Sequence, residues 1–369
     1  MSQAIKRDRK WQRVAKAGLL PAGWAYSAAM RARAACYSGV FSSWRPPAPC
    51  VSVGNISLGG SGKTPLAKGI LRLAADRGLL PALLTRGYKA GPPHYPYLVT
   101  AKSPVREAGD EPLLLARSCR QCLVVVDPRR DRAGSWVHQG FNPDLYVLDD
   151  GMQHLRVRRD LDLVLLGPGD VGRNWNRVLP SGPWREGKKA LERADALVLN
   201  APPARLAEIR EKLLSRIDPG ERPVFSMHLK AVGLKGPDGS DRSMGSCVPY
   251  LLLSAVANPE RVRATASQLF GSPPRTHLAF PDHHFFDRQD FDRIRRAADS
   301  HGCLAIVCTP KDRVKLDMAE DERLCSLDLR LCPGVVANTQ QAFRTWLESR
   351  LFPGTTASSL SRTDEEYEL

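Results

Sequence analysis

The 369-residue sequence lacks the cysteine pattern of a disulfide-stapled or zinc-binding protein. Its nine cysteines are scattered and odd in number, whereas disulfide frameworks usually show an even number in a short secreted chain. Cys119 and Cys122 form a CxxC pair, but no second pair follows at zinc-finger spacing. We therefore expect reduced thiols, as in a cytosolic protein.

Negative charge is also scarce. The sequence has 39 acidic residues against 54 Lys and Arg, which gives a formal net charge of +15. Such an excess favours an anionic partner, which could be nucleic acid, an acidic membrane face or a phosphorylated substrate. Because the sequence contains neither a helix-turn-helix signature nor an aromatic–basic module, we expect no nucleic-acid partner.

A hydrophobic run long enough to cross a membrane is missing too. Residues 17–30, AGLLPAGWAYSAAM, are uncharged and lie within a strongly basic segment, residues 1–35, but a transmembrane helix needs about 20 apolar residues. A basic start with a short apolar centre fits a signal peptide. It fits equally an interfacial helix, with Leu19, Trp24 and Tyr26 among lipid headgroups, or an ordinary surface helix.

The sequence does contain several short apolar runs that alternate with helical patterns. The clearest helix is residues 64–78, where Leu66, Ile70 and Leu73 share one face and Gly78 is a natural stop. Continuous apolar strands alternating with helices are typical of a parallel α/β sheet covered on both faces. The predicted strands of this sheet are residues 49–56, 79–87, 122–127, 144–150, 161–167 and 194–200.

The stretch VSVGNISLGGSGKTPLAKGI, residues 51–70, resembles a phosphate-binding loop. Ser57 stands where the strict G-x-x-x-x-G-K-[ST] pattern has glycine. The loop nevertheless joins a strand to a helix, and its glycines allow main-chain N–H groups to turn inward around an anion. Lys63 can reach the terminal phosphates and the Thr64 hydroxyl can ligate Mg²⁺. The predicted nucleotide-binding residues are Ser57, Leu58, Gly59, Gly60, Ser61, Gly62, Lys63 and Thr64.

A pair of acids follows another predicted strand, in LYVLDDG. Asp149 and Asp150 come directly after four apolar residues. In nucleotide-binding folds an acid at this place holds Mg²⁺ or its water. We therefore predict that Thr64, Asp149 and Asp150 form the magnesium site.

The composition changes after about residue 217. A Gly-, Pro- and Ser-rich stretch predicts a hairpin-like connection, and the strand and helix patterns beyond it predict a second α/β unit. We expect an amphipathic N-terminal helix (1–36), a P-loop NTPase-like core (37–225), a smaller α/β lid domain (226–350) and a disordered tail (351–369).

Phosphate-binding loops occur in several protein classes. A GTPase should carry N/T-K-x-D, whereas TPKDR has Lys311 directly before Asp312. A nucleotide-switched binding protein of the metallochaperone type would also suit the loop, and scattered Cys and His residues could serve it. A kinase differs from such a switch because it transfers the phosphoryl group to an acceptor.

An ordered set of motifs carries a resemblance to one family. VGNISLGGSGKTP, LTRGY, AGDEP, LDDGMQH, RDLDLVLL, LPSGPWRE, ANPERV and FPDHHFF follow one another across about residues 45–315. Together they resemble the tetraacyldisaccharide 4′-kinase (lipid A 4′-kinase) family, whose loop also has serine in place of the first glycine. LTRGYKAGPP departs modestly from that family's usual R-G-Y-G-G run.

The resemblance implies ATP- and Mg²⁺-dependent phosphorylation of the 4′-hydroxyl of an acylated glucosamine disaccharide 1-phosphate, giving lipid IVA. It also implies a peripheral enzyme on the cytoplasmic face of the inner membrane, with no obligate protein partner. On this basis the N-terminal segment is best interpreted as a membrane-lying helix rather than a signal peptide. The basic net charge then suits an anionic substrate and an anionic membrane surface.

The resemblance further implies roles for single residues. Asp110 in AGDEP is the expected catalytic base, assisted by His283 of PDHH, with His284 as the alternative; an N-cap is the plainer role for Asp110. Lys63 and Arg185 are the other expected catalytic residues, Arg185 through its planar fork on phosphate. Expected substrate-binding residues are Arg86, Tyr88, Gln153, His154 and Glu186.

Overall fold

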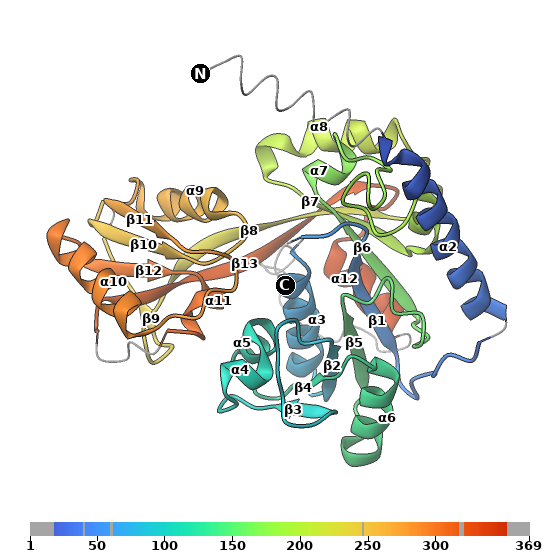
Figure 1. The fold of residues 1–369 in the computed structure, drawn as a ribbon, viewed down its shortest axis with the longest axis horizontal. Coiled ribbons are helices and arrows are strands. Elements are labelled where there is room, and N and C mark those ends of the chain that lie inside the picture. Colours follow the sequence, from blue (N-terminus) through green and yellow to red (C-terminus); the bar gives the residue numbers. More distant parts are fainter. Residues whose placement is uncertain (1–17, 40, 60–61, 246, 317–320, 353–369) are drawn as a thin grey trace.

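The computed structural model describes residues 18–352, apart from residues 40, 60–61, 246 and 317–320. It confirms the predicted α/β class. The strands form one continuous thirteen-stranded sheet in the order β11-β10-β12-β13-β8-β7-β6-β1-β5-β2-β4-β3, with β9 paired to β8. Figure 1 shows two lobes along this sheet: we call residues 236–323 the second lobe and the larger part the first lobe.

Six strands of the first lobe lie within the predicted runs, and a short strand at residues 97–99 lies outside them. β1 is central and pairs in parallel with β5 on one side and β6 on the other, and every residue of β1 is buried. The strands are β1 (Cys50–Asn55), β2 (Pro81–Thr85), β3 (Tyr97–Val99), β4 (Leu123–Val126), β5 (Leu145–Asp149), β6 (Leu161–Leu166) and β7 (Ala196–Asn200). Because β1, β2 and β5 to β7 are parallel neighbours, the loops after their carboxyl ends meet at one edge of the sheet.

Helices cover both faces of the sheet in the first lobe (Figure 1). The predicted helix at 64–78 is α3 (Lys63–Asp76), which buries Leu66, Ile70 and Leu73 against the sheet. The others are α2 (Leu20–Gly39), α4 (Val105–Ala108), α5 (Asp110–Ser118), α6 (Arg130–Phe141), α7 (Pro168–Val171), the 3₁₀ helix η1 (Lys188–Arg193), α8 (Pro203–Leu214) and α12 (Phe343–Leu351).

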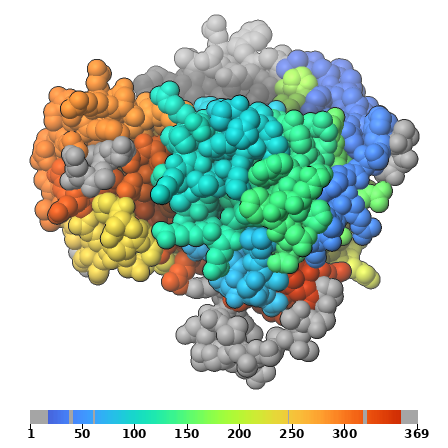
Figure 2. Space-filling view, turned by 90° about the horizontal axis from the view of Figure 1, so that it is seen from below, coloured from blue at the N-terminus to red at the C-terminus, as the bar shows by residue number. Residues whose placement is uncertain are grey.

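The second lobe combines strands and helices, as the sequence patterns beyond residue 226 predict. It contains β9 (Asp241–Arg242), β10 (Tyr250–Ser254), α9 (Pro259–Phe270), β11 (Thr276–Ala279), α10 (Arg288–Ser300), β12 (Ala305–Cys308) and α11 (Pro310–Arg313). β10 lies between β11 and β12 and pairs with both in parallel. In the space-filling view this lobe, yellow to orange, abuts the teal surface of the first lobe (Figure 2).

A long antiparallel ribbon, which the sequence analysis missed, joins the lobes. It consists of β8 (Val224–Lys235) and β13 (Leu324–Ala337), paired from Val224↔Ala337 to Lys235↔Ser326. The predicted hairpin is only the short β8–β9 pairing at its outer end. The sequence does not predict β13, because Pro333 and Gly334 interrupt its apolar pattern and strand signals weaken at such residues.

The ribbon runs across the predicted boundary between the core and the lid domain. The expected break between residues 225 and 226 falls inside β8. α12, which lies within the expected 226–350 unit, packs in the first lobe's core, where Phe343 and Trp346 contact Phe225. The chain therefore leaves the first lobe through β8 and returns through β13. Residues 1–17 of the expected N-terminal helix lie outside the described residues. Of the expected tail at 351–369, only residues 351 and 352 are described.

Two further expectations concern the cysteines and the membrane. The structure pairs Cys119 and Cys122 as a disulfide, where we expected reduced thiols; the short loop after α5 brings their Cα atoms to 5.4 Å, within the usual range for such a bond. In the part of the chain that the structure describes, no helix combines the length and the apolar character needed to span a bilayer.

Candidate active site

The predicted phosphate-binding loop connects β1 to α3 at the carboxyl edge of the sheet. Gly59 and Gly62 have φ of 115° and 85°, a region that favours glycine. Gly62 is the N-cap of α3, and a Cβ there would lie 2.4 Å from the Asn200 side-chain nitrogen. The strand–loop–helix arrangement is therefore present, with Lys63 and Thr64 in the first turn of the helix. Gly60 and Ser61 lie outside the described residues.

The beginning of the loop is tied to the segment around Arg185. Ser57 is buried and forms an isolated antiparallel bridge with Trp184. The Leu58 N–H donates to the Pro183 carbonyl at 2.8 Å, and the Arg185 N–H donates to the Ile56 carbonyl at 2.7 Å. Ser57 thus serves as a bridging residue next to a fully buried tryptophan. The Leu58 side chain is 53% exposed.

Lys63 is held at the centre of a polar cluster. Its Nζ donates to Asn55 Oδ1 at 2.9 Å and lies 3.3 Å from Asp150 Oδ1. Arg185 Nη1 donates to Asp150 Oδ2 at 2.7 Å and to Gln153 Oε1 at 3.1 Å. The structure therefore brings predicted residues from three separate motifs together. Two of them are cations suited to phosphate oxygens.

The two acids after β5 have opposite electrostatic environments. Burial, reinforced by Glu111, raises the pKa of Asp149 to about 6, although Thr85 Oγ1 donates to its Oδ2 at 3.0 Å. Burial also acts on Asp150, but Lys63 and Arg185 outweigh it and hold the pKa of that carboxyl below its usual range. Adjacent residues of one strand end thus differ in how readily they carry negative charge.

Oxygen donors near the loop fit a hard divalent cation. Asp149 Oδ1 is buried and makes no hydrogen bond within the described part of the chain. The Thr64 hydroxyl donates to Glu111 Oε2 at 2.9 Å. Mg²⁺ prefers such oxygens and completes its shell with water and phosphate. In the part of the chain that the structure describes, no group of three or more His, Cys, Asp or Glu side chains gathers at one place to hold a metal ion.

Asp110 and His283 meet across the two lobes. Asp110 is the first residue of α5 and only 3% exposed, and its Oδ2 lies 3.1 Å from His283 Nδ1. No side-chain cap bond is made by the α5 N-cap, which is Gly109 rather than Asp110. His284 instead binds Asp290 Oδ2 at 2.7 Å, within the second lobe. The geometry therefore pairs Asp110 with His283.

Two of the predicted substrate-binding residues line the edge of this cluster. The Tyr88 ring is 68% exposed, and its centroid lies 5.3 Å from that of His283. Gln153 Nε2 donates to the Asn55 carbonyl at 3.2 Å, which places Gln153 beside the loop. Arg86 follows β2 and is exposed. Burial, followed by nearby Arg130, lowers the pKa of His154 to about 3, so His154 is neutral at physiological pH.

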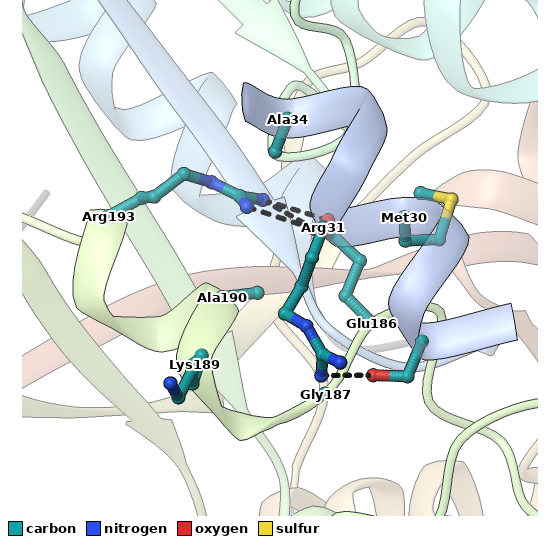
Figure 3. Close-up of a pocket in the computed structure, with 9 residues that line it drawn as sticks. Met30, Arg31, Ala34, Glu186, Gly187, Lys189, Ala190 and Arg193 are labelled. Carbon is teal, nitrogen blue, oxygen red and sulfur yellow. Dashed lines mark hydrogen bonds and ion pairs between the residues drawn. The ribbon is translucent and has the colours of Figure 1, made fainter. Parts of the chain in front are cut away.

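Glu186 lies elsewhere, under the N-terminal helix. It is 4% exposed and forms a forked ion pair with Arg193 at 2.8 Å. This pair borders a cavity of about 100 Å³ between α2 and η1, lined also by Arg31 and Lys189 (Figure 3). Glu186 therefore forms an ion pair with the last residue of η1, beneath α2.

Sequence reasoning missed several residues of the cluster. Glu111, Asn55 and Lys311 contact Thr64, Lys63 and His283 respectively. Arg261, in the ANPERV motif, donates to Asn200 Oδ1 at 3.1 Å and so joins the second lobe to the loop region. Each lies within or beside a quoted motif. Residue types at short spacing do not tell which side chain of a motif turns inward.

Comparison with known proteins gives a consistent result. Residues 15–351 match the family model described as tetraacyldisaccharide-1-P 4′-kinase. The chain is 44% identical to the tetraacyldisaccharide 4′-kinase of Nitratidesulfovibrio vulgaris, over 90% of this chain and 93% of that protein, and 45% identical to that of Oleidesulfovibrio alaskensis, over 81% and 83%.

A solved structure extends the likeness to the fold. LpxK from Aquifex aeolicus in complex with ATP superposes with a TM-score of 0.70 at 26% identity, covering 91% of this chain and 98% of that one. By sequence and by fold, this chain belongs to the tetraacyldisaccharide-1-P 4′-kinase family.

Proposed function

We propose that this chain transfers the terminal phosphoryl group of ATP to the 4′-hydroxyl of a tetraacyldisaccharide 1-phosphate, giving lipid IVA. One observation carries the proposal beyond family membership. Asp110 and Glu111 are consecutive: Glu111 bonds Thr64 of the phosphate-binding loop while Asp110 bonds His283. The candidate base is thus adjacent in the chain to a side chain that contacts the loop proposed to hold the phosphates, as transfer to an alcohol requires.

The loop and its neighbours would hold the nucleotide. The loop would present main-chain N–H groups, the amino group of Lys63 and the N-terminus of α3 to the phosphates. Thr64, Asp149 and Asp150 would hold Mg²⁺, which neutralises phosphate charge when bound. Arg185 would stabilise charge on the transferred group.

Asp110 would accept the proton of the attacking hydroxyl. A buried carboxylate bonded to a histidine is held in one orientation, and His283 supplies that bond from the second lobe. The base and its partner come from different lobes, so the site is complete only when the lobes are together. Closure would exclude water and so limit wasteful ATP hydrolysis.

The N-terminal helix would rest on the cytoplasmic face of the inner membrane. α2 buries the small residues Gly23 and Ser27 against the first lobe, while Leu20 and Trp24 are 41% and 70% exposed. An exposed tryptophan and a basic chain suit an anionic lipid surface. Flotation with vesicles of anionic and of neutral lipid tests this: equal recovery with both would refute the electrostatic part.

The decisive experiment follows label from γ-labelled ATP. The chain is incubated with Mg-ATP and acylated disaccharide 1-phosphate, and the lipid is analysed by mass spectrometry. We expect one added phosphate on the lipid. Release of free phosphate alone would refute the kinase and favour the nucleotide-switched binding protein.

A further inference from the structure

A fully buried lysine lies next to the proposed base. The Lys315 side chain has no exposed surface, and its Nζ is 3.5 Å from Asp110 Oδ2 and 3.0 Å from Asp312 Oδ1. The Phe286 ring covers it, with its centroid 5.6 Å from Nζ. Burying an ammonium group is costly unless it is paired, so these two carboxylates account for its place.

Asp312 anchors this lysine to the second lobe. Asp312 is itself fully buried, and its Oδ2 accepts from Thr309 Oγ1 at 2.7 Å and from the Ala255 N–H at 3.0 Å. Those two bonds occupy Oδ2 and leave Oδ1 facing Lys315. The lysine is therefore fixed by the frame of its own lobe, and its contact with Asp110 crosses to the other lobe.

Lys315 and His283 reach the same atom of Asp110. The histidine Nδ1 and the lysine Nζ both contact Oδ2, at 3.1 and 3.5 Å. Both partners belong to the second lobe, while Asp110 begins α5 in the first. Two contacts on one oxygen orient the carboxylate and direct its other oxygen, Oδ1, away from them.

Lys311, four residues earlier, provides a contrast. Its Nζ lies 3.3 Å from Glu111 Oε1 and 3.2 Å from His283 Nε2, and its side chain is 19% exposed. The two lysines thus meet the two consecutive acids of α5, one at the rim and one in the interior. Lys311 is open to screening by water, whereas Lys315 is not.

We propose that Lys315 is a positioning residue whose buried ammonium group pairs with the Asp110 carboxylate and ties it to the second lobe. The proposal rests on the proposed kinase function for its consequence in catalysis. The charged and titratable groups that face Asp110 are Glu111 on its own helix and His283, Lys311 and Lys315 from the second lobe, with Asp282 and Asp312 behind them. A positive charge at this distance favours the ionised form of a carboxylate.

The test compares Lys315→Met, Lys315→Arg and the surface control Lys212→Met, which removes an exposed lysine paired with Glu208 on α8. The pH dependence of kcat/KM for the lipid is measured in each full-length variant. We expect the acid limb of the Lys315→Met profile to move up by about one pH unit. KM for ATP should stay within about twofold, and Lys315→Arg should restore much of the wild-type profile.

A second measurement does not depend on activity. Carbon-13 NMR follows the Asp110 carboxyl during pH titration, with its signal assigned through Asp110→Asn. We expect titration at higher pH in Lys315→Met than in wild type or Lys212→Met. An unchanged titration and an unchanged acid limb would overturn the proposal, even if the wild type phosphorylates the lipid.

Two other outcomes are also informative. A wild type that leaves the lipid unmodified would refute the proposed function, while the NMR titration would still decide the role of Lys315. If Lys315→Met does not fold, Lys315→Gln replaces it, because glutamine keeps a donor without the charge. The same shift is then expected, and its absence contradicts the proposal.

Discussion

Two pairs of consecutive acids, Asp149–Asp150 and Asp110–Glu111, lie near the phosphate-binding loop. They differ in which lobe supplies their cationic partners. The first pair ends a central strand and is met by Lys63 and Arg185 from the same lobe. The second begins a helix and is met by side chains of the other lobe. The first pair is therefore complete within one lobe, whereas the second requires both.

This difference suggests a division of labour. An acid pair fixed inside one lobe can hold a cation and its nucleotide whether or not the lobes are together. An acid pair whose partners arrive from the other lobe changes its environment when the lobes separate. Truncating the chain after residue 225 would not test this cleanly, because it would also remove α12, which packs in the first lobe's core.

The largest effect is expected for Asp110→Asn. Asparagine keeps the shape but cannot accept the proton, so kcat should fall by about 10²–10⁴. ATP affinity should remain near wild type, because the loop and the Asp149–Asp150 pair are untouched. Steady-state kinetics and ATP titration measure both, with the exposed Asp292→Asn as control. Normal turnover in Asp110→Asn would remove this residue from the mechanism.

Lys63→Ala should lower turnover by about 10²–10³ and also weaken ATP binding. The reason is that Lys63 belongs to the loop, where it would contact phosphate both before and during transfer. Its effect on ATP affinity separates it from Asp110→Asn. Lys212→Ala serves as the matched surface control. If Lys63→Ala and Asp110→Asn lost the same amount of ATP affinity, the assignment of nucleotide binding to the loop and of proton acceptance to Asp110 would be contradicted.

Asp149→Asn and Asp150→Asn should change stability in opposite directions. The pKa of Asp149 is raised to about 6 by burial, so its charge opposes folding above pH 6 and the penalty disappears as pH falls towards 4. Asp149→Asn should therefore stabilise the nucleotide-free protein by about 1–3 kcal/mol at pH 8 and by little at pH 4.

Asp150 carries the opposite sign. Its pKa is lowered, because Lys63 and Arg185 outweigh burial, so its charge favours folding at neutral pH and that contribution fades as pH falls through its folded pKa. Asp150→Asn should destabilise the protein at pH 8. Denaturant unfolding at pH 4 and pH 8 measures both variants. Changes of the same sign would contradict this account of the strand end.

The smallest effect is expected at the two histidines. His283→Ala removes one bond to Asp110 and should reduce kcat about tenfold, which corresponds to about 1.4 kcal/mol. His284→Ala should be close to wild type, because His284 binds Asp290 within its own lobe. His284→Ala therefore serves as the control for His283→Ala. A greater loss for His284→Ala would reverse the assignment.

Much of the first lobe could be predicted from sequence because its signals are local. A buried parallel strand such as β1 is a short continuous apolar run, and the glycines before Lys63 mark the turn that follows. The ribbon of β8 and β13 was harder to predict from the sequence. β13 contains Pro333 and Gly334, and its partner β8 lies about a hundred residues away, so no local pattern announces the pairing.

By itself, the sequence predicted the segments to which we assign the chemistry: the loop at 57–64, the acids after β5 and the motifs containing Asp110 and His283. These depend on residue types at short spacing, which the chain fixes before folding. Only the tertiary structure decided that His283 rather than His284 meets Asp110, that Thr64 meets Glu111, and that Lys315 is buried beside them. Those choices arise because the ribbon sets one lobe against the other, bringing together side chains up to about two hundred residues apart, and no local rule encodes such distances.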